Sequence, residues 1–157
     1  MKLQRTFICI AGVFFAVGFA TSQAGAGTGI PGCSPGGIPG TDIEINALRA
    51  GAKTIVTGPN DTTNVTAKAR LLKGTAPPGT TLVTTLTIEA VTGGAVIGTA
   101  TAPNITLGVG KGGKGANLAV STTSCVDGFI SLFATFEGLD DDNDLCTETR
   151  LLRKDCR

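Results

Sequence analysis

The sequence predicts an all-β protein, a seven-stranded antiparallel β-sandwich with two disulfide bonds. Three observations lead to this fold class. Apolar residues recur at every second position in one segment after another, and turn-forming residues separate these segments at intervals of about eight to twelve residues. Beyond the N-terminal segment, no stretch combines a helical apolar period with helix-capping residues.

The strand that organises the core is predicted at residues 128–138. It contains Phe129, Phe133 and Phe136, the only aromatic residues outside the N-terminal segment. Successive side chains of a strand point to opposite faces, so one face here is apolar and the other is half apolar. The first face consists of Ile130, Leu132, Ala134 and Phe136, and the second of Phe129, Ser131, Phe133 and Thr135. This pattern is typical of a central strand of a sheet.

Six further strands are predicted from the same alternation. They span about residues 42–49, 65–71, 80–91, 95–109, 116–122 and 147–154, and a short extended piece lies at 53–57. Turn signals separate them, most clearly at residues 58–61 and in Thr92-Gly93-Gly94. We treat residues 95–109 as one strand kinked at Pro103-Asn104; the alternative is a hairpin.

The N-terminal residues have the features of a secretory signal peptide. Lys2 and Arg5 precede an apolar run at residues 7–20, which is short for a membrane span. Small residues follow, and we expect cleavage after Ala26 or after Ala24. The predicted organisation is a signal peptide at 1–26, a Gly/Pro-rich arm at 27–40 and one β-sandwich domain at 41–157. The expected location is extracellular or periplasmic, and the alternative is a retained membrane anchor.

Composition restricts the chemistry that the chain can perform. The sequence has 13 Lys and Arg against 12 Asp and Glu, so removing Lys2 and Arg5 leaves 11 against 12, a net charge of −1. A nearly neutral chain without a basic patch argues against nucleic acid as a partner. The sequence contains no histidine, which excludes Ser-His-Asp and Cys-His catalysis and most zinc sites. We therefore expect a protein that is not an enzyme.

The order and spacing of the strands over about residues 41–156 resemble an immunoglobulin-like or fibronectin type III-like domain. The resemblance implies an architecture and no particular function. The core tryptophan and the corner tyrosine of such domains have no counterpart here, because the chain contains neither residue type.

Four cysteines follow the signal segment, an even number in an exported chain. If the strands alternate up and down, Cys125 and Cys156 lie at one end of the sandwich. Cys33 and Cys146 then lie at the other end. The expected disulfides are therefore Cys33–Cys146 and Cys125–Cys156. The first pairing depends on residues 95–109 being a single strand, since a hairpin there would move Cys33 away from Cys146.

The loop at residues 138–146 is rich in acids. Asp140, Asp142 and Asp144 occupy alternate positions, a spacing that suits one Ca²⁺ ion. The loop lacks the glycine and the bidentate glutamate of an EF-hand, because Leu145 and Leu151 stand at those positions. A calcium site is one interpretation, and a solvated acidic turn between two strands is the other. No other cofactor is expected.

Two other kinds of site are indicated. Asn60, Asn64 and Asn104 each begin an Asn-x-Thr glycosylation pattern. Phe129 and Phe133 lie on the face opposite the main core residues, where they form a partner-binding patch if Leu151 or Leu152 does not cover them.

The preferred hypothesis is an exported, non-enzymatic binding or adhesion module at the cell surface or in the periplasm. It would bind a protein or a glycan and would not span the membrane after signal cleavage. The alternative is a structural subunit of an extracellular filament or surface assembly. In that case the arm at 27–40 would add to the sheet edge of a neighbouring copy.

Overall fold

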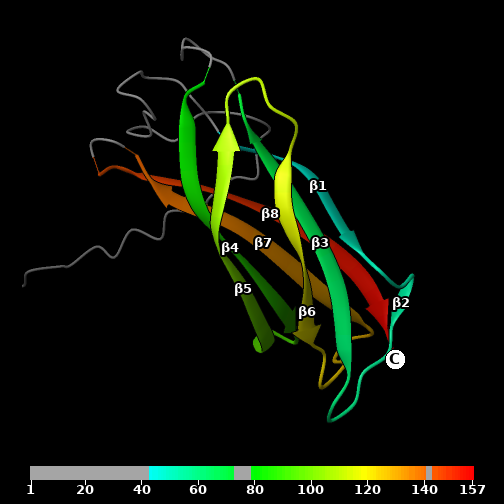
Figure 1. The fold of residues 1–157 in the computed structure, drawn as a ribbon. Helices are drawn as coiled ribbons and strands as arrows, with labels where there is room; N and C mark the ends of the chain where they lie inside the picture. The colour runs from blue at the N-terminus through cyan, green and yellow to red at the C-terminus, as the bar shows by residue number, and fades with distance from the viewer. Residues whose placement is uncertain (1–42, 73–78, 141–142) are drawn as a thin grey trace, which may run out of the picture.

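The computed structural model describes residues 43–72, 79–140 and 143–157. Two β-sheets face each other in these residues and enclose a single core (Figure 1). One sheet has three strands in the order β1-β3-β6, and the other has five in the order β2-β8-β7-β4-β5. The predicted signal peptide and the arm at 27–40 lie outside the described residues.

The described residues form eight strands, and the longer ones lie where the alternation in the sequence predicts them. The eight are β1 (Ile43–Ala50), β2 (Thr54–Ile55), β3 (Thr62–Leu71), β4 (Thr81–Thr92), β5 (Ala95–Gly108), β6 (Lys114–Ser121), β7 (Phe129–Leu139) and β8 (Leu145–Cys156). In β3, β4 and β7, buried residues alternate with more exposed ones along almost the whole strand. Each of these strands therefore has one face in the core and one toward solvent.

The core lies between the inner faces of the two sheets. β7 contributes Ile130, Leu132, Ala134 and Phe136, all fully buried. The facing sheet contributes mainly Val65, Ala67, Ala69 and Val120, which are also fully buried. The small Ala67 and Ala69 of β3 share one core with the larger residues of the five-stranded sheet, so the layers pack despite the shortage of aromatic side chains. β7 lies between β8 and β4, so its predicted place inside a sheet is confirmed.

β5 is one strand of 14 residues, not a hairpin. It pairs with β4 from Thr81↔Gly108 to Thr92↔Ala95, with two register shifts. Near its N-terminal end, β5 also approaches β6 of the other sheet. A Cβ atom added at Gly98 of β5 would overlap the main-chain oxygen of Ser121 on β6. Glycine at this position therefore lets the two sheets meet along one side of the sandwich.

Two parts of the predicted fold class are wrong. The described residues form eight strands instead of seven, because the short extended piece around Thr54–Ile55 pairs with the end of β8. That pairing is parallel, so the sandwich is not wholly antiparallel. A two-residue strand is too short to show a period in the sequence, and its main-chain pairing depends on the position of β8.

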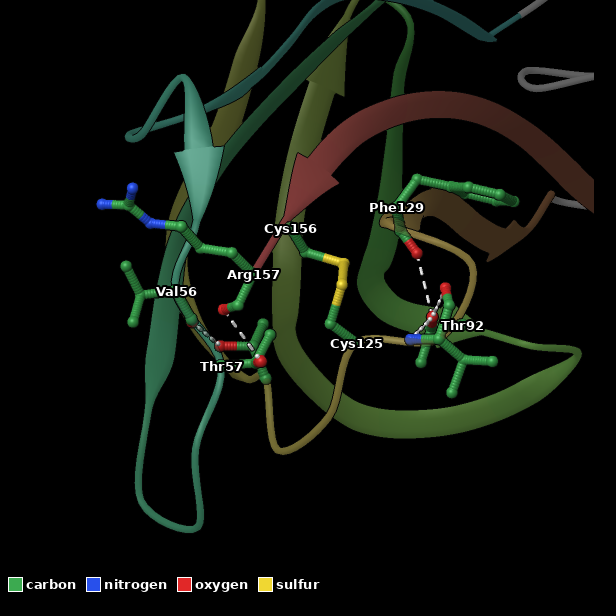
Figure 2. The surroundings of a disulfide bond; sticks show 9 residues. Val56, Thr57, Thr92, Cys125, Phe129, Cys156 and Arg157 are labelled. Atoms are coloured by element: carbon green, nitrogen blue, oxygen red, sulfur yellow. Dashed lines mark hydrogen bonds between the residues drawn. A yellow bond between two sulfur atoms is a disulfide. The ribbon is translucent and has the colours of Figure 1, made fainter.

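One disulfide joins residues that the structure describes, Cys125 to Cys156, with Cα atoms 5.8 Å apart (Figure 2). This is one of the two expected pairings. The second expected bridge, Cys33–Cys146, involves a residue outside the described ranges, and it stays a prediction. Cys146 itself is fully buried.

Hydrogen bonds around the Cys125–Cys156 disulfide hold the C-terminal end of the chain in place. The main-chain oxygen of Arg157 accepts from the amide and the hydroxyl of Thr57, at 3.0 and 3.1 Å. On the other side of the bridge, the buried hydroxyl of Thr92 lies 2.8 Å from the oxygen of Val126 and 2.9 Å from that of Phe129 (Figure 2). The amide of Val126 donates to the same hydroxyl at 2.8 Å.

Candidate functional site

The outward side of the five-stranded sheet, here called the outer face, carries the predicted Phe129 and Phe133 patch. Strand register arranges its side chains in rows across the sheet. The central row is Thr99–Glu89–Phe133–Leu151, and a neighbouring row is Thr101–Thr87–Thr135–Thr149. The strand pairing therefore brings together residues from four separate segments of the sequence.

Phe129 and Phe133 have different neighbours on the outer face. The guanidinium of Arg153 lies 3.2 Å from the centre of the Phe129 ring, so a cation covers one side of this aromatic. Phe133 stands opposite Leu151, whose surface is 52% exposed. Both phenylalanines are half-buried. Leu152, the other residue expected to cover them, is opposite Leu132 and packs against the core.

The row of four threonines separates Phe133 from the acidic end of the sheet. The hydroxyls of Thr135 and Thr149 are hydrogen-bonded at 2.9 Å. Threonine pairs of this kind stabilise strand pairing. Their hydroxyls both donate and accept hydrogen bonds, so this row gives the outer face a polar band that can bind polar groups of a partner.

Beyond the threonine row the sheet has a hollow of about 420 Å³. Its walls include Val83, Thr85, Asn104, Glu137, Leu139 and Leu145. Val83, Leu139 and Leu145 are exposed by 53%, 58% and 50%, although they are large apolar residues. Leu139 and Leu145 are direct cross-strand partners. The hollow thus combines an apolar wall with the carboxylate of Glu137, the amide of Asn104 and the exposed hydroxyl of Thr85.

A β-bulge shapes one side of this hollow. Between Thr84↔Ile105 and Leu86↔Ala102, one residue of β4, Thr85, is opposite two residues of β5. One of those two is Asn104, which has a positive φ of 61°. Asparagine tolerates this left-handed conformation better than most residues. Bulges redirect side chains at sheet edges and near binding sites, and β5 is the edge strand of this sheet.

The acidic loop forms the turn between β7 and β8. Asp140 and Asp144 are joined by two hydrogen bonds. The Asp140 amide donates to the main-chain oxygen of Asp144 at 3.0 Å, and the Asp144 amide donates to the side-chain Oδ1 of Asp140 at 2.8 Å. Asp140 is buried. Asn143 has a positive φ of 64°, as a tight turn requires. These bonds give the Asp140 carboxylate a structural role in the hairpin.

The calcium interpretation is neither confirmed nor contradicted. Asp142 lies outside the described residues, and within the described ranges no group of three or more His, Cys, Asp or Glu is placed to hold a metal ion. The site at Asp140, Asp142 and Asp144 stays a prediction. Melting temperature measured with and without added Ca²⁺ tests it, because an ion that binds only the folded state raises stability.

The three candidate glycosylation sites, Asn60, Asn64 and Asn104, are all exposed. Asn60 lies in the turn before β3, Asn64 lies on β3, and Asn104 lies at the bulge of β5. A glycan on Asn104 would occupy the hollow, whereas Asn60 and Asn64 are not among the residues that line it. Use of these sites stays a prediction.

Sequence reasoning missed the hollow and the cation on Phe129. The alternation of β7 places Glu137 on the same face as Phe133 and Thr135, and this was the available signal. The other walls come from β4, β5 and β8, and their register depends on the bulge at Asn104. Alternation within one strand does not reveal which residues of other strands lie beside it.

The comparisons with known proteins add no family assignment: no family, curated protein or solved structure matches this chain. In the described part of the chain, no helix is long and apolar enough to cross a membrane.

Proposed function

We propose that this protein is an exported, non-enzymatic binding or adhesion module of the cell surface or periplasm. The outer face of its five-stranded sheet would contact a protein or glycan partner. The observation that carries this proposal is the half-buried Phe133 beside the exposed Leu151, with threonine hydroxyls in the next row. An apolar centre with polar surroundings is the usual composition of a protein interface.

The chemistry of the chain supports binding over catalysis. General acid-base catalysis most often uses histidine, and the sequence has none. On the outer face the ionisable residues Glu89, Glu137, Arg153 and Asp155 occupy four different rows of the sheet. These residues include no histidine or lysine to activate a neighbouring threonine hydroxyl, and this favours recognition over catalysis.

We also propose an immunoglobulin-like arrangement of the strands. With β1, β3, β4, β5, β6, β7 and β8 taken as strands A, B, C, C′, E, F and G, the sheets read ABE and GFCC′. Immunoglobulin-like domains divide their strands between two sheets in a similar way. The short β2 then provides a second segment of the first strand, paired with the last strand.

The binding proposal is tested with fluorescently labelled, purified protein added to intact cells of the source organism. We expect surface binding that Phe133→Ser or Leu151→Ser weakens severalfold. Val56→Ser is the matched control, because Val56 is similarly exposed, by 54%, but lies next to β2. Equal binding by all variants would contradict a role for the outer face.

Export is tested separately, by the mass and the N-terminal sequence of the protein released from cells. Cleavage after Ala26 leaves Gly27 as the first residue, and cleavage after Ala24 leaves Gly25. Recovery of the uncleaved, reduced chain from the cytosol would contradict export.

The alternative proposal is a structural subunit of an extracellular assembly. It is favoured by the position of β1, which directly follows the arm at 27–40 and is an edge strand of its sheet. Addition of a strand at an exposed sheet edge is a common mode of protein association. Size-exclusion chromatography at rising concentration tests this: larger species that disappear on deletion of 27–40 support it, and a monomer at every concentration contradicts it.

A further inference from the structure

We infer that the hollow at the end of the outer face binds a basic side chain, lysine or arginine, from an extended segment of the partner. The hollow is the one defined above by Val83, Thr85, Asn104, Glu137, Leu139 and Leu145. This inference rests on the proposed binding function and names the chemistry that one part of the face recognises.

The apolar wall fits the aliphatic part of such a side chain. Three large apolar residues from three adjacent strands, Val83, Leu139 and Leu145, are each at least half exposed around one hollow. Long basic side chains place their methylene groups along apolar surface while the charged end stays near polar groups. Burying part of this wall under a methylene chain would remove apolar area from water.

Charge complementarity selects a cation. Glu137 is exposed and is the only ionisable residue among the described residues of the wall, which therefore offer a carboxylate and no Lys or Arg. Thr85 and Glu137 are direct cross-strand partners, so hydroxyl and carboxylate lie side by side. Thr85 and Asn104 add uncharged oxygen acceptors for the remaining protons of an ammonium or guanidinium group.

The bulge gives the hollow a defined shape. It places Asn104 opposite Thr85 on the edge strand β5, in a backbone conformation with φ of 61°. On the facing side, the backbone at Gly138 lies so close to β4 that a Cβ there would overlap the main-chain oxygen of Val83. The walls therefore belong to paired strands, and we expect the hollow to exist before the ligand binds.

The experiment is an NMR titration of the isotope-labelled, oxidised protein with two capped tripeptides, acetyl-Gly-Lys-Gly-amide and acetyl-Gly-norleucine-Gly-amide. The peptides share an aliphatic side chain and differ in the charge at its end. We expect millimolar binding of the lysine peptide, with shift changes centred on the amides of Thr85, Asn104 and Glu137. The norleucine peptide should bind about two- to fivefold more weakly, the range for an exposed ion pair.

Two variants assign the charge effect. Glu137→Gln should lower affinity for the lysine peptide about two- to fivefold and abolish the preference over norleucine. Glu89→Gln is the matched control, because Glu89 is also an exposed glutamate of the outer face but lies outside the hollow. Leu145→Ser should weaken the binding of both peptides alike. Raising the salt concentration should weaken the binding of the lysine peptide only.

Three outcomes would overturn the inference. They are no binding of the lysine peptide, equal binding of both peptides by the unmodified protein, or a loss of lysine-peptide affinity in Glu89→Gln as large as that in Glu137→Gln. Each leaves the proposed function standing if cell-surface binding still depends on Phe133. Conversely, Phe133→Ser should keep the tripeptide affinity unchanged, because Phe133 is not part of the hollow.

Discussion

Alternate residues of β7 face two different environments. Ile130, Leu132, Ala134 and Phe136 are fully buried between the sheets, whereas Phe129, Ser131, Phe133 and Thr135 are half-buried on the outer face. The two sets come from one strand, and phenylalanine occurs in both, although the outer set also includes Ser131 and Thr135. The surrounding strands therefore decide the environment of each aromatic residue: Phe136 packs between the layers, and Phe133 keeps part of its surface in solvent.

The largest expected effect is on the inner face. Phe136→Ala should lower the free energy of unfolding by about 3–5 kcal/mol, because it leaves a cavity among fully buried side chains. Phe133→Ala should cost less, about 1–2 kcal/mol, since its ring lies on the outer face and keeps part of its surface in solvent. Urea denaturation of both variants measures the contrast. Similar losses would show that the two faces of β7 are not energetically different.

The next largest effect is expected for the Cys125–Cys156 disulfide. Replacing both Cys125 and Cys156 by alanine should lower the unfolding free energy by roughly 2–4 kcal/mol, because the bridge closes a loop with a sequence separation of 31. The sheets should still form, and far-ultraviolet circular dichroism checks this. An unchanged denaturation midpoint would mean that the packed core alone holds this end together.

A smaller effect is expected for the buried hydroxyl of Thr92. Thr92→Val keeps the shape but leaves the Val126 amide without its acceptor, so we expect a loss of about 1–3 kcal/mol. Faster hydrogen exchange at Val126 than at core amides would locate the damage. A variant as stable as the parent would indicate that water takes over the hydroxyl's role.

The smallest effect is expected for polar residues of the outer face. Thr135→Val removes the exposed hydrogen bond to Thr149, and we expect a change within about 0.5 kcal/mol in either direction. The same denaturation assay measures it, with Thr92→Val as the reference for a buried hydroxyl. A loss as large as that of Thr92→Val would mean that the threonine row is structural and not simply a binding surface.

The strands of this chain were predictable where local pattern was strong. Residues 128–138 have aromatic and aliphatic residues on a strict two-residue period, and they form β7 almost as expected. Residues 95–109 were harder, since Pro103-Asn104 could mark either a kink or a turn, and the bulge shows that it is a kink. The two-residue β2 carried no period and was not predicted as a strand.

The candidate site was predictable only in part. Phe129 and Phe133 were identified from the alternation of a single strand. The rest of the outer face depends on neighbours: Arg153 approaches Phe129 from β8, and Asn104 reaches the hollow from β5. Neither relation is encoded in one segment, because register between strands sets which side chains meet.

By itself, the sequence determined the class of the fold, because alternation and turns are local properties of the chain. It also determined the absence of histidine chemistry, which is a property of composition. Only the tertiary structure decided which faces are covered and which residues share a row or a hollow. The physical reason is that main-chain hydrogen bonds between distant segments fix the register, and one bulge at Asn104 shifts every row beyond it.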